Sequence, residues 1–433
     1  MAGSLTAGPY AMHRLLRPLA ATAVLASAAA LAAPVGGPHT DPQGRTAVIV
    51  GQTSDGIRHY LQDGRLPRPW GVTMYVAPTL DSAGFTLADG RRSDNAAWYA
   101  TGFGPQSLSF ITGTPQLAGS ALAVGLWMGN RMDVDLATGS NHSGANDGNR
   151  LWSNLRRLVG DLKATGRPVL LRIGYEAEGP WNGYWPEAYK AVWSRLRAEI
   201  RTQQADNIAT VWQLAALCPA RDAWNAGIQP GQLIAANPQP PQGPARGTVR
   251  NVDTADPGAV LDAWYPGDDA DWTALSVFEP QDCHDGYRTL QAVVDYLKTK
   301  GKPILVAEAA ARGYDYDPAT GLYAYRQVGK PVRERLAPEQ VWREWHAPFL
   351  AFVRANRDAI RAVALISDDW QRYTHWQCRV DADGTPRAGC AEGNWGDTRL
   401  DVNPRLRALW QAELTADGQF LAEPSRASWP SGR

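Results

Sequence analysis

The feature that most constrains the fold of this chain is a regular alternation of short apolar segments with longer amphipathic ones. Such apolar runs, bounded by turn residues, are typical of buried strands. They occur at 71–76, 121–127, 169–174, 208–214, 273–278, 304–307 and 362–366. Between them, apolar residues recur at helical spacing over 152–164, 187–201, 287–300 and 338–357. Repeated strand, helix and strand predict a parallel sheet with helical crossovers.

The connections between these segments are asymmetric. The turns from helix to strand at 165–168 and 299–303 are short, whereas long irregular segments follow the strands, the longest at 235–257. This asymmetry predicts the α/β fold class, specifically a single (β/α)8 TIM barrel with loop insertions. The functional site of such a barrel lies in the loops after the strands. A doubly wound open sheet is the alternative, but no GxGxxG or phosphate-binding loop supports it. We expect the barrel to span residues 34–414 and residues 415–433 to form a C-terminal tail.

The N-terminus has the pattern of an export signal. His13, Arg14 and Arg17 precede an apolar run at 19–33, which ends with the small residues Ala30 and Ala32. The run is about 15 residues long against the ~20 needed to span a bilayer, so a signal peptide at 1–33 is favoured over the alternative, a membrane anchor. We therefore expect a secreted or periplasmic protein with no membrane contact after signal cleavage.

Charge and cysteine content indicate which binding partners, disulfides and metal sites the chain can have. The chain has 43 Lys and Arg against 43 Asp and Glu, so its net charge gives no support for a nucleic-acid partner. Four cysteines in an exported chain suggest two disulfides, for which the hypothesis is Cys218 with Cys283 and Cys378 with Cys390. No CxxC or HExxH motif occurs, so we expect no metal and no cofactor. A monomer is expected.

Two glutamates come at the ends of predicted strands. Counting back from 362–366 as the eighth strand makes 304–307 the seventh and 169–174 the fourth, so Glu176 follows strand four and Glu308 ends strand seven. Barrel enzymes take reacting groups from such positions. Strand alternation would place Arg172, Gly174 and Glu176 on one face. Because burying a carboxylate without purpose is costly, Glu176 and Glu308 are the catalytic candidates.

The residues around these glutamates carry a family resemblance. Residues 171–184 read Leu-Arg-Ile-Gly-Tyr-Glu-Ala-Glu-Gly-Pro-Trp-Asn-Gly-Tyr, which resembles the strand-four motif of clan A glycoside hydrolases, closest to the family 26 mannanase-like group. Residues 302–308 resemble the strand-seven motif that ends in the nucleophile; 264–272, and 395–397 with 403–404, are also similar to that group. The resemblance implies a retaining mechanism with Glu176 as acid/base and Glu308 as nucleophile.

The chain departs from this family pattern at three places. Tyr175 stands where the mannanases have His and most of the clan has the Asn that binds the sugar 2-hydroxyl. Glu178 stands where the mannanases have Asn, and it is a second candidate for a share in the acid/base role. Phe278 and Glu279 end strand six, where the clan often has a Tyr bonded to the nucleophile. The identity of the sugar therefore stays open.

Aromatic and polar side chains near the pair are expected to bind substrate, because a sugar ring presents an apolar face that stacks on aromatic rings. Trp370, after strand eight, is expected to form the floor of the central subsite, with core packing as the alternative. Asp368 is expected to accept hydrogen bonds from sugar hydroxyls, or else to cap a turn. The full set of expected substrate-binding residues is Arg172, Tyr175, Glu178, Trp181, Tyr184, Glu279, Asp368 and Trp370.

These observations lead to one main hypothesis. It is an exported retaining glycoside hydrolase that cleaves a polysaccharide or oligosaccharide, either β-mannan or another bacterial or plant glycan, by double displacement with two glutamates. The alternative is a non-catalytic carbohydrate-binding barrel or surface protein, which the atypical Tyr175 and Phe278 favour. A serine esterase is disfavoured because the sequence has no GxSxG segment.

Overall fold

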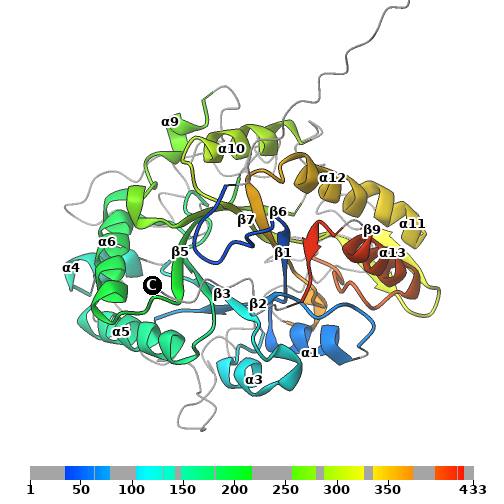
Figure 1. Ribbon diagram of the computed structural model, residues 1–433, viewed down its shortest axis with the longest axis horizontal. Helices are drawn as coiled ribbons and strands as arrows, with labels where there is room; N and C mark the ends of the chain where they lie inside the picture. The colour runs from blue at the N-terminus through cyan, green and yellow to red at the C-terminus, as the bar shows by residue number, and fades with distance from the viewer. Residues whose placement is uncertain are drawn as a thin grey trace, which may run out of the picture. The chain divides into compact units, whose positions relative to one another are not determined.

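Eight parallel strands close into a barrel in the computed structural model, which describes residues 35–62, 64–78, 104–129, 131–141, 148–179, 182–216, 256–278, 287–325, 335–373, 395–416 and 418–423. In barrel order the strands are β1 (Thr46–Val50), β2 (Gly71–Val76), β3 (Ala121–Leu126), β4 (Val169–Ile173), β5 (Ile208–Leu214), β6 (Trp272–Val277), β7 (Ile304–Ala309) and β10 (Ile360–Leu365). β10 pairs with β1 and closes the ring, with helices around it (Figure 1). The predicted TIM barrel is confirmed, and the open sheet is excluded.

Three of the four predicted helices are observed with similar bounds, as α5 (Gly148–Ala164), α6 (Pro186–Thr202) and α10 (Arg288–Lys298). A further long helix is α13 (Pro404–Thr415), and the shorter ones are α1 (Ser54–Gln62), α3 (Leu108–Gly113), α4 (Met132–Thr138) and α9 (Gly258–Leu261). The predicted helix at 338–357 is divided into α11 (Pro338–Val341), a π-helical segment Trp342–His346 and α12 (Ala347–Ala355). Asn403 caps α13 by accepting hydrogen bonds from the amides of Arg405 and Leu406, which fixes where this helix begins.

Four strands were not predicted. β1 is a five-residue strand whose residues are all buried; it directly follows a polar segment and is too short to give a clear pattern. β8 (Tyr314–Asp317) and β9 (Leu322–Tyr325) form an antiparallel hairpin after β7. β11 (Phe420–Leu421) pairs with β1, so the predicted tail at 415–433 contributes to the sheet at this point. Within the described ranges, no helix is both long and apolar enough to cross a membrane.

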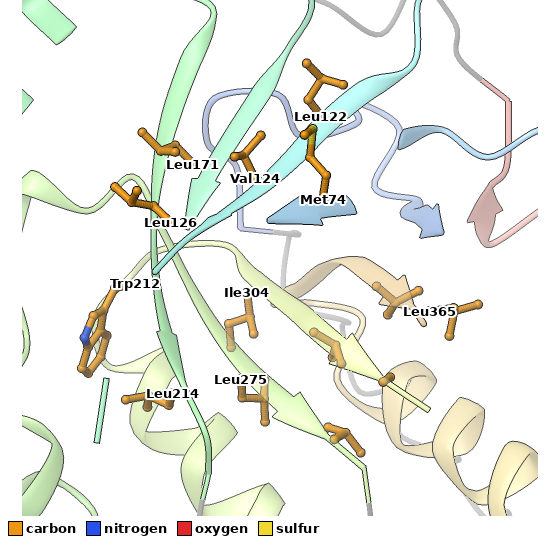
Figure 2. Close-up of a cluster of buried hydrophobic side chains, with 14 of the residues drawn as sticks. Met74, Leu122, Val124, Leu126, Leu171, Trp212, Leu214, Leu275, Ile304 and Leu365 are labelled. Atoms are coloured by element: carbon orange, nitrogen blue, oxygen red, sulfur yellow. The ribbon is translucent and has the colours of Figure 1, made fainter. Parts of the chain in front are cut away.

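The two faces of the barrel strands bury different side chains. The interior contains mainly small residues, among them Ala47, Ala121, Ala123, Ala274, Ala307, Ala362 and Ala364. The outer faces carry larger apolar side chains that belong to the same cluster as helix residues, and ten of them are labelled in Figure 2: Met74, Leu122, Val124, Leu126, Leu171, Trp212, Leu214, Leu275, Ile304 and Leu365. This alternation, with period two along each strand, leaves the interior positions near the C-terminal strand ends for polar groups.

A buried histidine lies in the outer layer. His346 is 3% exposed and packs against the rings of Trp342, Trp345 and Trp410, with ring centroids 4.9 to 5.5 Å apart. Neither of its ring nitrogens has a hydrogen-bond partner in the described part of the chain. Burial lowers the pKa of His346 to about 3, so the folded protein holds this imidazole neutral.

This pKa predicts acid sensitivity. Below its ordinary pKa of 6.5 the histidine binds a proton in the unfolded chain but not in the folded one, so stability falls with pH from that value toward the folded pKa of about 3. Between pH 7 and pH 5 the native protein should lose about 2 kcal/mol more than the His346→Phe variant. Urea unfolding at the two pH values measures this difference, and equal losses in both proteins would contradict it.

Candidate active site

The charged centre of the barrel is Arg172, on the interior face of β4. It is fully buried. Its Nη1 donates to Oε1 of Glu308 at 2.7 Å and to Oε1 of Gln213 at 3.0 Å, and its Nη2 donates to Oγ1 of Thr73 at 3.0 Å. Burial alone would lower the pKa of Arg172, but Tyr75 and Glu308 raise it above its ordinary value. The guanidinium therefore stays charged inside the barrel and neutralises Glu308.

A β-bulge aims Glu308 at this arginine. Val306 pairs with Leu275 of β6, whereas Glu308 pairs with the next β6 residue, Ser276, so β7 has one extra residue over this stretch. The register with β10 is shifted in the same place. Strict alternation after Ala307, which faces the interior, would turn Glu308 toward the helices. The extra residue keeps it inside, the kind of re-aiming for which bulges near active sites are known.

Glu176 reaches the same end of the barrel by a different route. β4 ends at Ile173, and both Gly174 and Glu176 have left-handed backbone, with φ of +56° and +51°. The predicted strand alternation through Glu176 is therefore wrong: a tight turn, not an extended strand, presents this carboxylate. Asn182 stabilises the turn, since its Nδ2 donates to the carbonyls of Tyr175 at 2.9 Å and of Glu176 at 3.2 Å. A non-glycine residue held in this conformation is a strain typical of functional sites.

Two side chains connect the carboxylates. Oγ of Ser276 donates to Oε1 of Glu176 at 2.8 Å, and Nε2 of Gln213 donates both to Oγ of Ser276 at 3.0 Å and to Oε1 of Glu308 at 3.1 Å. Glu176 and Glu308 are 8% and 6% exposed. The structure thus brings the two candidate glutamates to one end of the barrel, as expected. Thr73, Gln213 and Ser276 were not among the predicted site residues, although a polar residue at an inward position of an apolar strand is a usable signal.

Glu178 has contacts of a structural kind. It is 2% exposed, and its Oε2 and Oε1 accept hydrogen bonds from the main-chain amides of Ala215 at 2.9 Å and Ala216 at 2.7 Å. These amides follow the end of β5, and Ala216 has a φ of +55°. We expected Glu178 to bind substrate or to share the acid/base role, and these contacts do not favour either function. Its carboxylate instead fixes the segment after β5 against the turn after β4.

The two tyrosines predicted near the site differ in their surroundings. Tyr175 is half-buried and packs edge-on against Tyr75, with ring centroids 5.3 Å apart. Burial, with nearby charges including Glu308, raises the pKa of Tyr175 well above its ordinary value, so its hydroxyl stays protonated. Tyr184 is 3% exposed, and its hydroxyl accepts a hydrogen bond from the amide of Met128. In this arrangement Tyr184 supports the site from the core, and Tyr175 borders it.

Asp368 joins the end of β10 to α1. It is 2% exposed; its Oδ2 accepts from Oγ1 of Thr53 at 2.5 Å, and its Oδ1 accepts from the Tyr373 hydroxyl at 3.2 Å and the Asp369 amide at 2.9 Å. Burial raises the pKa of Asp368 to about 6. A Cβ at Gly56 would lie 2.7 Å from Oδ2, so α1 approaches the carboxylate closely because of that glycine. These contacts hold Asp368 within the fold.

Trp370 is covered by a second tryptophan. It is 1% exposed, stacks on Trp395 with ring centroids 4.5 Å apart, and donates from Nε1 to Oγ1 of Thr398. Trp395 in turn contacts Phe278 edge-on at 4.9 Å and lies under the guanidinium of Arg312 at 4.1 Å. The predicted open stacking surface at Trp370 is therefore replaced in this conformation by a tryptophan pair, with Trp395 as its outer member.

Some predicted residues lie outside the described part of the chain: Trp181, Glu279 and the cysteines Cys218, Cys283, Cys378 and Cys390. Among the described residues, no group of three or more His, Cys, Asp or Glu side chains is arranged to hold a metal ion. The chemistry available in the described site is that of two carboxylates, one arginine and their hydrogen-bond partners.

Comparison with known proteins finds two β-1,3-xylanases among the sequence relatives. No family model matches the chain. Two sequence relatives are the β-1,3-xylanase TXYA of a Vibrio species, 29% identical over 86% of this chain and 65% of its own, and a β-1,3-xylanase of an Alcaligenes species, 28% identical over 86% and 64%. The chain thus spans a little under two thirds of the length of either. It resembles clan A glycoside hydrolases of the family 26 type.

Solved structures with a similar fold include mannanases. The Bacillus subtilis mannanase is 13% identical, with a TM-score of 0.40 over 78% of this chain and 89% of that one. A family 26 β-mannanase from Bacteroides ovatus is 12% identical, with a TM-score of 0.44 over 89% and 93%. The sequence relatives are therefore named for xylan, and these structural neighbours for mannan.

The packing around Arg172 gives a testable prediction. A Cβ at Gly125 of β3 would lie 2.6 Å from Cδ1 of Tyr75 and 2.8 Å from Nη2 of Arg172, so this glycine makes room for the guanidinium. Gly125→Ala should destabilise the protein by about 1 to 3 kcal/mol. Gly113→Ala is the matched control, since no atom lies within 4 Å of its added Cβ at the end of α3. Urea unfolding should show a neutral or slightly stabilising change there; equal effects at both sites would contradict the crowding.

Proposed function

We propose that the chain is a retaining glycoside hydrolase that cleaves a polysaccharide by double displacement, with Glu308 as nucleophile and Glu176 as acid/base. The observation that carries this proposal is the connection of two buried carboxylates, through Gln213 and Ser276, at the C-terminal end of one barrel. Sites of TIM-barrel enzymes lie at this end. Relatives that are themselves glycoside hydrolases support the same reaction class.

The contacts of each glutamate support its role. Oε1 of Glu308 accepts from Arg172 and Gln213, and these two donors, one of them a cation, hold the carboxylate in a fixed orientation for attack. The ion pair of Arg172 goes to Glu308, which leaves Glu176 as the carboxyl group that exchanges protons. A retaining mechanism needs the two carboxyl groups about 5 Å apart, a separation within reach of a pair bridged by two side chains.

The reaction then has two balanced steps. Glu176 gives its proton to the glycosidic oxygen while the bond from that oxygen to the anomeric carbon breaks and a carboxylate oxygen of Glu308 bonds to that carbon. The leaving chain departs as an alcohol. Glu176, now ionised, takes a proton from a water molecule whose oxygen attacks the anomeric carbon, and the bond to Glu308 breaks. Both glutamates return to their starting protonation states.

β-1,3-Xylan is the substrate that the sequence relatives favour. The departures from the mannanase pattern agree with this choice, because Tyr175 replaces the expected His or Asn beside the acid/base. Tyr175 is half-buried next to Tyr75, in a position to contact a sugar ring bound over Glu308. The N-terminal pattern at 1–33 supports export, so we place the enzyme outside the cytoplasm, in the periplasm or medium, acting as a monomer.

A substrate panel tests the reaction and the sugar together. Purified protein should release reducing ends from β-1,3-xylan, with much lower rates on β-1,4-mannan and β-1,4-xylan, and NMR of the first product should show the β anomer retained. An α anomer would contradict double displacement. Binding of β-1,3-xylan without any reducing ends would instead favour the non-catalytic carbohydrate-binding barrel.

The role of Glu308 has its own test. Glu308→Gln should lower kcat on the preferred polysaccharide by at least ~10⁴-fold, because the amide cannot form the glycosyl intermediate. Circular dichroism and thermal unfolding should show an intact fold. Glu339→Gln is the matched control, since Glu339 lies in α11 with 42% of its side chain exposed and pairs with Arg405, and it should retain full activity. Substantial activity in Glu308→Gln would end the assignment.

A further inference from the structure

The hydrogen bonds between Arg172 and Glu176 run in one direction. A guanidinium can only donate, so the Gln213 atom that meets Nη1 of Arg172 at 3.0 Å must be the amide oxygen. This settles which way the amide of Gln213 points, a choice that only its neighbours can make. Its Nε2 therefore faces Glu308 and Ser276, and donates to both.

The direction continues through the serine. Because Nε2 of Gln213 donates to Oγ of Ser276, that oxygen acts as an acceptor on the side of Gln213, and its own proton is directed to Oε1 of Glu176 at 2.8 Å. Ser276 is 4% exposed and Gln213 is fully buried, so bulk water does not compete for these bonds. Arg172 thus determines, through two intermediate side chains, that Oε1 of Glu176 is an acceptor.

We propose that Ser276 is a positioning residue for the acid/base: oriented by Arg172 and Gln213, it donates to Oε1 of Glu176 and so assigns the transferable proton to Oε2. This inference rests on the proposed role of Glu176. An oxygen that already accepts the serine proton is the carbonyl oxygen of the protonated carboxyl group. The acidic proton then sits on Oε2, which is the oxygen that gives it to the glycosidic oxygen and later takes one from water.

The same network marks the reacting oxygen of the nucleophile. Oε1 of Glu308 accepts from both Arg172 and Gln213. Its lone pairs are committed, so Oε2 is the atom that bonds to the anomeric carbon. Arg172 and Gln213 therefore select the reacting oxygen of Glu308, and Ser276, oriented by Gln213, selects that of Glu176. This selection needs donors on β5, which carries Gln213, and on β6, which carries Ser276.

Other ionisable groups surround Glu176 without carrying the proton in question. Glu308 comes from β7 and Arg172 from β4, and the tyrosines Tyr75, Tyr175 and Tyr184 come from β2 and from the segment after β4. Burial raises the pKa of each of these three tyrosines, so they stay neutral over the working pH range. None of these groups changes in a Ser276 variant.

The test is the sign of a pKa change in Ser276→Ala. A hydrogen bond donated to a carboxylate stabilises its charged form, so its loss should raise the pKa of Glu176 by about 0.5 to 1 unit. A serine that instead accepted the carboxyl proton would give a shift of opposite sign.

Carbon-13 NMR of labelled glutamate carboxyls, assigned with Glu176→Gln, measures this pKa without turnover. Ser276→Thr, which keeps the hydroxyl, should restore the native value. Thr273→Val is the control in the same strand. It removes a buried hydroxyl that has no hydrogen-bond partner in the described part of the chain, and it should leave the pKa of Glu176 unchanged.

Kinetics give a second readout. In Ser276→Ala the alkaline limb of the kcat/KM profile should move upward with the NMR value, and kcat on the polysaccharide should fall about 10-fold. An aryl glycoside, whose leaving group needs little protonation, should lose less than about 3-fold. An unchanged or lowered pKa, or equal losses on both substrates, would overturn the positioning role. If the native protein hydrolyses nothing while the upward NMR shift appears, the proposed function fails but the direction of the hydrogen bonds holds.

Discussion

The buried ion pair between Arg172 and Glu308 is the interaction on which the rest of the site depends. Two charges removed from water gain little net stability, because desolvation offsets most of their attraction. Nε of Arg172 is also buried without a hydrogen-bond partner in the described part of the chain. A barrel interior filled with alanine and leucine would be at least as stable. A costly polar group in such a position is retained for what it does, and here it orients and neutralises a carboxylate.

The departures from ideal barrel geometry gather around this pair. A bulge in β7 turns Glu308 inward, left-handed backbone at Gly174 and Glu176 bends the chain after β4, and Gly125 leaves space for the guanidinium. Each is unfavourable or neutral for stability when taken alone. Together they place two carboxylates, carried by strands three positions apart in the barrel, within one hydrogen-bonded network. Proteins commonly have strained local geometry at functional sites and regular geometry elsewhere, as this barrel does.

Most of the barrel could be predicted from the sequence, because strand and helix periodicities are local properties. The glutamates of strands four and seven were found for the same reason: each directly follows an apolar run. Their surroundings could not be found in this way. The bulge at Glu308 depends on the register with β6, and the role of Glu178 depends on amides of Ala215 and Ala216 that lie 37 and 38 positions further along the chain. Trp370 is a residue type that often stacks on sugar rings, but its sequence position does not reveal that Trp395 covers it in the fold.

The strand-six departure shows how a missing residue can be replaced by neighbours. Phe278 stands at the end of β6, where the clan often has a tyrosine that donates to the nucleophile, and its ring packs against Trp395 instead. In this chain Nε2 of Gln213, from β5, donates to Glu308, and Ser276, two positions before Phe278, donates to Glu176. A single tyrosine hydroxyl has one proton to give, whereas the amide and hydroxyl together have enough for both carboxylates. The amide orientation of Gln213 is therefore the link between Glu308 and Glu176 in this chain.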